Sequence, residues 1–236
     1  MLRKLLIFHA GFQRYETGLK LQSYLASLVK DPSENIAGYL FLVEHHPVYT
    51  TGMRSKDYGS EIEQRLTALG ADFHRANRGG FITFHGPGQL VVYPILNLNH
   101  FQPKVKWYVQ TLEKTIIAVC NHFNLTAYTT PDTGVWVNEK KVCAMGIRVS
   151  QYITTHGLAL NCNTNLSWFE EVTPCELVGK KATSLSAECG RNINIDEVSP
   201  FFLLEFGKHF QCELEPCSKA FVEDVFAEIH ADSEQK

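Results

Sequence analysis

A glycine-rich block in the first half of the chain most restricts what this sequence can fold into. Arg78–Gln89 reads Arg-Gly-Gly-Phe-Ile-Thr-Phe-His-Gly-Pro-Gly-Gln, with four glycines in twelve positions. Glycine loses more backbone entropy on folding than other residues, so such a cluster marks tight turns or backbone that a ligand approaches. The block is neither a P-loop, which needs Gly-Lys-Ser/Thr, nor a G-x-G-x-x-G fingerprint. From spacing alone, a ligand site and a pair of hairpin turns are equally good interpretations.

Hydrophobic periodicity outside this block predicts alternating strands and helices. Lys104–Phe123 is the strongest helix, because apolar residues recur along it every three or four positions. Short apolar or alternating runs predict strands, the last three forming a β-meander: 5–8, 39–43, 81–84, 90–96, 135–137, 142–149 and 153–162. Other helices are expected at 15–29, 60–70, 197–210 and 221–229. This order is compatible with many mixed folds and identifies none of them.

The overall composition argues against several classes of protein. The 236 residues carry a net charge of −3, without the basic stripe of a general nucleic-acid binder. No apolar run approaches the roughly 20 residues that span a bilayer. The seven cysteines are odd in number and include no C-x-x-C pair, which disfavours a disulfide framework or a zinc site and favours a reducing compartment. Basic residues without an acid among the first 15 hint at a mitochondrial address, although Leu5–Phe8 is better interpreted as a strand.

The glycine-rich block, with Tyr93 four residues after it, resembles the signature of octanoyl-[acyl-carrier-protein]–protein N-octanoyltransferases, also called lipoyl(octanoyl) transferases. Other segments that are similar to this family follow in order along the chain: His46–Thr50, Lys141–Arg148, His156–Asn161, Pro174-Cys175 and Thr183–Leu185. Together they cover residues 40–190, and the sequence of residues 156–169 is most similar to that of the animal, mitochondrial branch. Several ordered blocks at the right separations make the resemblance highly specific.

The resemblance implies an α+β fold, that of the biotin/lipoate protein ligase catalytic domain, with a mixed sheet flanked by helices. We therefore expect a single catalytic domain over residues 1–236, with a small helical C-terminal piece from about residue 194. The implied activity transfers an octanoyl group from octanoyl-acyl-carrier-protein, through a cysteine thioester, to a lysine of a lipoyl domain. The implied acceptors are the lipoyl domains of 2-oxoacid dehydrogenase complexes and the glycine cleavage H protein. Neither a cofactor, a metal, a membrane nor a nucleic acid is expected, and the implied location is mitochondrial.

The resemblance also implies which residues act. In the family, the cysteine of a Pro-Cys pair takes the acyl group and a lysine lowers the pKa of that thiol, which implies Cys175 and Lys141 here. The chemistry is sound, because only a thiolate is a nucleophile and a nearby ammonium stabilises it. The implied acyl site consists of Arg78, Gly79, Gly80, Phe81, Ile82, Thr83, Phe84, His85, Ala144, Met145, Gly146, His156, Gly157, Leu158 and Ala159.

Several of these residues also have ordinary structural interpretations. His85 and His156 either donate to an acyl oxygen and move a proton, or lie in the core bonded to backbone. Cys175 is one thiol among seven, in what reads as an exposed loop. Strand alternation sends Lys140 and Lys141 to opposite faces, and we expect Lys140 to be the solvated one.

One position departs from the family pattern. The family places glycine directly after the nucleophile, where this chain has Glu176, and a carboxylate there opposes Lys141 by raising the pKa of the thiol. Either Glu176 points to solvent and has little effect, or it reduces the activity or alters the pocket. Three alternative functions also stay open. One is an ATP-dependent lipoate-protein ligase, which needs no cysteine, and another is a lipoyl amidotransferase, which draws on a lipoylated protein. The third is a non-catalytic module that binds carrier or lipoyl domains.

Overall fold

A seven-stranded sheet runs through the centre of the molecule. The computed structural model describes residues 3–31, 33, 36–54, 58–172 and 181–234. The strand order is β10-β1-β2-β6-β9-β8-β7, with β1 parallel to both β10 and β2 and the other neighbours antiparallel. The bounds are β1 Arg3–Gln13, β2 Gly38–His45, β6 Gln89–Leu96, β7 Val135–Val137, β8 Lys140–Ser150, β9 Ile153–Asn161 and β10 Cys212–Pro216. Cys175 and Glu176 lie outside the described residues.

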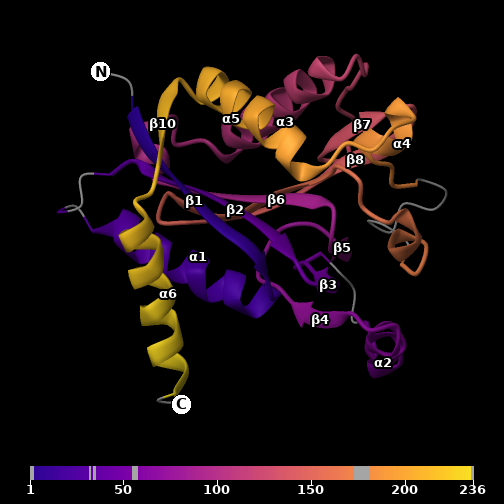
Figure 1. Ribbon diagram of the computed structural model, residues 1–236, viewed down its shortest axis with the longest axis horizontal. Coiled ribbons are helices and arrows are strands. Elements are labelled where there is room, and N and C mark those ends of the chain that lie inside the picture. Colours follow the sequence, from indigo (N-terminus) through magenta and orange to yellow (C-terminus); the bar gives the residue numbers. More distant parts are fainter. Residues whose placement is uncertain (1–2, 32, 34–35, 55–57, 173–180, 235–236) are drawn as a thin grey trace.

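Helices cover both faces of this sheet (Figure 1). Helices α3 (Val105–His122) and α5 (Ile195–Phe210) lie on one face, and α1 (Tyr15–Lys30) and α6 (Lys219–Glu234) on the other. Helix α3 packs on the sheet through its predicted apolar stripe, in which Tyr108, Leu112 and Ile116 are all fully buried. Burying a side chain of this size stabilises a fold by about 1.5–3 kcal/mol. The second apolar cluster joins α1 and α6 to the opposite face.

A small second sheet adjoins the glycine-rich block. Its order is β4-β3-β5, with β3 at Val48–Thr51, β4 at Asp72–Arg75 and β5 at Thr83–His85. Helix α2 (Ser60–Ala68) and the 3-10 turn Leu166–Phe169 pack on it. Phe84 lies at the centre of this packing, stacked on Trp168 with ring centroids 5.0 Å apart.

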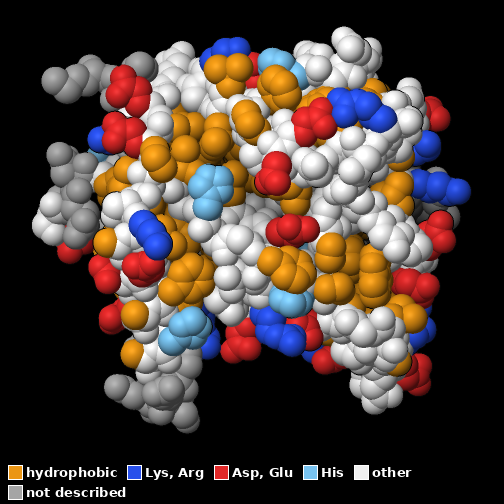
Figure 2. Space-filling view, viewed as in Figure 1, with side chains coloured by type: hydrophobic (Ala, Val, Ile, Leu, Met, Phe, Trp, Pro, Cys, Tyr) orange, Lys and Arg blue, Asp and Glu red, His pale blue; other side chains and the backbone are white. Residues whose placement is uncertain are grey.

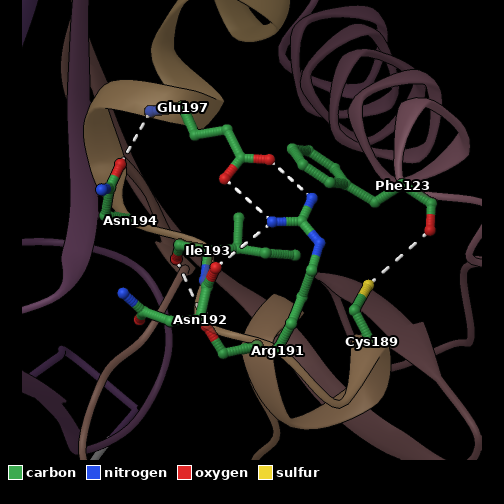
Figure 3. Close-up of polar contacts among 8 residues, drawn as sticks. Phe123, Cys189, Arg191, Asn192, Ile193, Asn194 and Glu197 are labelled. Atoms are coloured by element: carbon green, nitrogen blue, oxygen red, sulfur yellow. Dashed lines mark hydrogen bonds and ion pairs between the residues drawn. The ribbon is translucent and has the colours of Figure 1, made fainter.

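The connection between α4 (Leu185–Cys189) and α5 is fixed by polar contacts, which Figure 3 shows. The Asn194 side chain accepts a hydrogen bond from Glu197 N at 2.9 Å, which caps α5. The Glu197 carboxylate in turn binds the Arg191 guanidinium through both oxygens, at 2.6 and 3.0 Å. Cys189 Sγ donates to Phe123 O, which links this turn to the end of α3.

The chain beyond residue 194 is only partly helical. It forms α5 and α6 as expected, but β10 lies between them and joins the edge of the main sheet beside β1. Cys-Glu-Leu-Glu-Pro has only five residues and most of them are exposed, so its sequence carries no strong strand pattern. The structure thus adds a strand to the expected helical piece.

Most long elements lie where periodicity predicted them, while several short strands were missed or misplaced. The helix expected at 104–123 is α3, and the expected meander is β7, β8 and β9. The strand expected at 81–84 was misplaced, since β5 begins only at Thr83. β3 and β4 were not predicted at all, because each has only four residues. No helix in the described part of the chain is both long enough and apolar enough to cross a membrane.

Candidate active site

A cavity of about 350 Å³ lies where the glycine-rich block meets β8 and β9. This volume is in the range of ligand sites, which begins near 300 Å³. All but one of the described residues expected in the acyl site line it, and so does Lys141. The exception is Phe84, whose ring packs in the second sheet on the side away from the cavity. Because neighbouring side chains of a strand point to opposite faces, Thr83 and His85 reach the cavity while Phe84 does not.

Two close backbone contacts join the block to β8. Gly79 N donates to Ile147 O at 2.9 Å, and a Cβ on Gly146 would stand 2.7 Å from Gly79 O. Gly80 has φ +91, a backbone conformation that favours glycine. These glycines are therefore needed for one wall of the cavity to form.

Arg78 shapes this wall from the inside. It is 6% exposed, and its guanidinium donates to Thr50 O at 2.8 Å, Thr50 Oγ1 at 2.7 Å and Phe81 O at 3.1 Å. These bonds fold the block back onto β3. The buried positive charge also influences neighbouring groups, since it contributes to lowering the pKa of both His85 and His156.

Lys141 lies at the beginning of β8 and lines the cavity. Its Nζ donates to Thr133 O at 3.1 Å and stands 4.8 Å from the centroid of the Trp136 ring. Its backbone pairs with a returning segment, because Lys141 N donates to Lys181 O and Thr183 N donates to Lys141 O, both at 2.9 Å. Lys140 lies 3.5 Å from Glu188 instead and does not line the cavity.

His85 has a defined proton position. Its Nδ1 lies 2.8 Å from Gln89 Oε1, and Gln89 Nε2 donates to Phe84 O and Asn161 Oδ1. Because the amide N–H groups are used there, the Gln89 oxygen faces the ring and Nδ1 must donate. Burial above all, with His45 and Arg78, holds the pKa of His85 well below its usual value. His85 Nε2 is therefore an acceptor.

His156 is the second histidine of the cavity. It is 7% exposed, and burial, with Arg78 and Arg148, lowers its pKa to about 4. Behind both rings, His45 Nδ1 donates to Gln13 O at 3.1 Å, so its Nε2 accepts from Tyr93 Oη at 2.9 Å. Both cavity histidines are thus neutral near pH 7.

The cavity includes residues that the sequence did not identify. They come from α1, α3, β8 and loops: Tyr15, Arg54, Val105, Val109, Pro131, Asp132, Thr133 and Ile147. Tyr15 is 1% exposed, and its ring is parallel to that of His85 with centroids 6.1 Å apart. Burial raises the pKa of Tyr15 to about 12, against the opposite influence of Arg78. Tyr15 lies 63 residues before Arg78, so local sequence held no signal of this contact.

The six cysteines of the described residues are poor nucleophiles. Burial is the first cause in every case, and it raises the pKa of each thiol: Cys120, Cys143, Cys162, Cys189, Cys212 and Cys217. For Cys120 and Cys162 the pKa reaches about 12. A thiol of this pKa is almost wholly protonated at pH 7 and does not attack a thioester.

Comparison with solved structures identifies the fold. A bi-partite lipoate protein ligase from Thermoplasma acidophilum is similar with a TM-score of 0.68 at 15% identity, covering 97% of this chain and 92% of that one. The biotin protein ligase of Aquifex aeolicus is similar with a TM-score of 0.50 at 14% identity, covering 89% and 69%. The expected biotin/lipoate protein ligase fold is therefore confirmed.

Comparison of sequences identifies the family. Residues 14–207 match the model of the lipoyl protein ligase A/B catalytic domain. The mitochondrial octanoyl-[acyl-carrier-protein]:protein N-octanoyltransferase of Danio rerio is 54% identical over 206 residues, which are 87% of this chain and 92% of that protein. The octanoyltransferase of Christiangramia forsetii is 42% identical over 185 residues, 75% and 79% of the two chains. The chain belongs to the lipoyl protein ligase A/B catalytic-domain family and, within it, to the octanoyltransferases.

Proposed function

We propose that this chain is an octanoyl-[acyl-carrier-protein]:protein N-octanoyltransferase that works through an acyl-Cys175 intermediate. The observation that carries the proposal is the 54% identity to a transferase of this name over nearly the whole chain. The cavity supports it, because the glycine-rich block, β8 and β9 meet there around Lys141. Neutral histidines, small residues and exposed backbone suit a thioester with an alkyl chain.

The reaction has two balanced steps. In the first, the Cys175 thiolate attacks the thioester carbonyl carbon, a new C–S bond forms, and the bond to the carrier sulfur breaks. The carrier thiol leaves with the proton that Cys175 gave up. In the second, a lysine amine attacks the acyl-Cys175 carbonyl carbon, a C–N bond forms, and the C–S bond to Cys175 breaks. The Cys175 sulfur leaves and takes up the proton that the amine loses. Since a thioester is already activated, this route needs no ATP.

Lys141 is the group that we propose to stabilise the Cys175 thiolate. Its backbone bonds to Lys181 and Thr183 fix the strand that follows the Cys175 segment directly beside β8. Cys175 is six residues before Lys181, a distance that the chain spans within about 20 Å. An ammonium near the thiol lowers its pKa. The raised pKa values of the six described thiols give further support, since a raised pKa disfavours the reactive thiolate in each of them.

We propose that the oxyanion of each tetrahedral intermediate binds N–H groups of Ala144–Gly146 rather than of Gly157–Ala159. β7 pairs with β8 only as far as Cys143, so the outer edge of β8 turns to the cavity from Ala144 onward. Leu158 and Ala159 instead lie on β9 between β6 and β8, with ladder partners on both sides. Donors at such a position are worth about 3 kcal/mol to a transition state.

The central experiment is the intact mass of the protein after incubation with octanoyl-acyl-carrier-protein, without ATP. We expect one octanoyl adduct on the wild type, none on Cys175→Ala, and slower formation on Lys141→Ala. Adding a lipoyl domain should then move the adduct to its lysine. An adduct that persists in Cys175→Ala would refute the covalent route. Lipoylation that requires ATP and survives Cys175→Ala would identify a ligase, while carrier binding without any adduct would identify a non-catalytic module.

The acceptors and the location are part of the same proposal. We propose lipoyl domains of 2-oxoacid dehydrogenase complexes and the glycine cleavage H protein as acceptors, in mitochondria. The support is the mitochondrial designation of relatives from Danio rerio, Drosophila melanogaster and Homo sapiens. Rates of octanoyl transfer to each purified acceptor, with a donor competition against lipoylated protein, separate this activity from that of an amidotransferase.

A further inference from the structure

The ladder between β6 and β9 is interrupted beside the cavity. The two strands pair from Gln89↔Asn161 to Val92↔Leu158, and one isolated bridge follows at Asn97↔Ile153. The same register continued through the gap places Pro94 opposite His156. Proline has no N–H, so a pair of ladder hydrogen bonds cannot form there. The backbone groups of both strands in this gap must therefore find other partners.

Two side chains form hydrogen bonds with these backbone groups. Thr154 Oγ1 accepts from Leu96 N at 2.9 Å and donates to Pro94 O at 2.6 Å. The N–H of His156 donates to Oε1 of Gln22 at 2.6 Å. Gln22 comes from the buried face of α1, more than 130 residues earlier in the sequence, and is 3% exposed.

His156 has a left-handed backbone conformation, with φ +56 in the middle of a strand. For a residue other than glycine this conformation is strained, and it persists only where the surroundings hold it. Strand alternation would place the His156 ring on the face of Leu158, which packs in the cluster with α3. The ring instead stands 6.1 Å edge-on from Tyr93, which belongs to the cluster with α1. The strained backbone thus redirects the imidazole.

The hydrogen bonds of Gln22 are only half satisfied. Its oxygen has the His156 N–H, but its Nε2 is buried with no hydrogen-bond partner among the described residues. A buried N–H without a hydrogen-bond partner destabilises the fold, and a methionine of the same length would avoid that penalty. Among the described residues, the hydrogen bond from the backbone N–H of His156 is therefore the only role that the structure shows for this amide.

We propose that Gln22 is a positioning residue for octanoyl transfer, which holds the His156 backbone in the conformation that presents the imidazole to the cavity. Gln22 does not line the cavity and acts only through His156. The proposal rests on the proposed transferase function, because it concerns the rate of that reaction. It adds a second residue of α1 beside Tyr15, outside the sequence blocks of residues 40–190.

The test compares Gln22→Met with Gln22→Glu in a steady-state assay of octanoyl transfer to a lipoyl domain. Methionine has similar length but no acceptor, so we expect kcat to fall at least tenfold with KM for the carrier protein within twofold of the wild type. Glutamate keeps an acceptor oxygen for the His156 N–H, so kcat should stay within about threefold. Gln64→Met, a matched change on the exposed side of α2, should alter neither constant.

A second comparison separates positioning from a merely structural role. In a His156→Gly background, the imidazole is absent and the left-handed conformation costs nothing. Gln22→Met should then lower kcat by less than twofold beyond His156→Gly alone. A Gln22→Met enzyme with wild-type kcat, a Gln22→Glu enzyme as slow as Gln22→Met, or a further tenfold fall in the His156→Gly background would each overturn the proposal.

Folding is followed separately by thermal unfolding of every variant. Should Gln22→Met not fold, Gln22→Asn makes the same comparison, since its shorter side chain withdraws the acceptor and should lower kcat at least fivefold. A Gln22→Asn enzyme with wild-type kcat then contradicts the proposal. A wild type that transfers no octanoyl group contradicts the proposed function instead, so the two failures are distinguishable.

Discussion

His85 faces the cavity as a neutral ring whose proton position is set by its neighbours. Gln89 fixes the ring, Asn161 fixes Gln89, and Asn161 Nδ2 donates to Thr183 O at 2.8 Å. Thr183 is also the residue that donates to the backbone of Lys141. One hydrogen-bonded chain therefore joins the histidine of the glycine-rich block to the strand that positions Lys141. Such buried networks are costly to break, because each removed partner leaves another polar group unsatisfied.

The proton position on His85 can be tested by changing Gln89. Gln89→Glu places a carboxylate 2.8 Å from Nδ1, and a carboxylate favours the protonated ring. We expect the pKa of His85 to rise by at least one unit, measured by ¹⁵N NMR of the imidazole across pH. The wild-type protein, measured under the same conditions, is the reference. An unchanged pKa of His85 would show that Gln89 does not control the ring.

Lys141 and Lys140 form a natural pair of target and control. Without the Lys141 ammonium the thiolate fraction of Cys175 falls, and one pKa unit corresponds to about 1.4 kcal/mol. We expect Lys141→Ala to slow the acylation of Cys175 at least tenfold at pH 7, with partial recovery at pH 9, where the thiol ionises unaided. Lys140→Ala, which removes only a contact to Glu188, should acylate within twofold of the wild type. Equal rates for both variants at pH 7 would contradict the proposed role.

At the scale of elements, α3 and α5 are joined by apolar packing and by one buried carboxylate. Glu205 is 6% exposed and lies 2.7 Å from Lys208 Nζ and 3.0 Å from His122 Nε2, so the contact spans both helices. The hydrogen bonds from Lys208 and then from His122 lower the pKa of Glu205. Because its pKa in the folded state lies below that in the unfolded state, this carboxylate stabilises the fold above about pH 4.3, and the contribution is lost as pH falls further.

Glu205→Gln tests this contribution. A neutral amide cannot form the charged contacts, so we expect the free energy of unfolding at pH 7 to fall by about 1 kcal/mol, a modest value because Lys208 is largely exposed. Near pH 3.5 the wild-type carboxyl is increasingly protonated, and the difference should shrink. Urea unfolding of both proteins at the two pH values measures it. If the difference in unfolding free energy between the two proteins grows on acidification, the pKa of Glu205 is raised by folding rather than lowered.

At the scale of the whole molecule, neutral histidines are concentrated around one cavity in a chain whose surface charges are mixed. On the face in Figure 2, acidic and basic side chains are interspersed rather than gathered into one field. Burial lowers the pKa of His45 and His156 to about 4, and that of His85 well below its usual value. The unfolded chain binds a proton at each of these sites below about pH 6.5, and the folded protein does not. Stability therefore falls as pH decreases from 6.5 toward 4.

Each of these histidines should lower the free energy of unfolding by about 1 kcal/mol between pH 7.5 and pH 5.5, because its pKa in the unfolded chain lies well above its pKa in the folded protein. Urea unfolding at a series of pH values gives the slope. In a His45→Gln variant one such group is removed, so the slope should decrease by about a third. A wild-type protein equally stable at pH 7.5 and 5.5 would mean that these rings are protonated in the folded state.

The sequence by itself determined the family, the fold that the family implies, the α3 helix and the group of segments that line the cavity. It did so because the glycines, the Lys141 block and the His156 block are local patterns whose order along the chain is specific. Short strands such as β3, β4 and β10 escaped prediction, since four or five residues carry too little periodicity to decide between strand and loop.

Only the tertiary structure decided which side chains face the cavity and what holds them there. Phe84 belongs to the implied acyl site by sequence, yet strand alternation turns it away. Tyr15 and Gln22 reach the site from α1, at separations that no local pattern records. The strain at His156 lies where the register places Pro94 opposite it, and register is fixed only when whole strands pair. Contacts of this kind depend on long-range packing, which a chain acquires only when it folds.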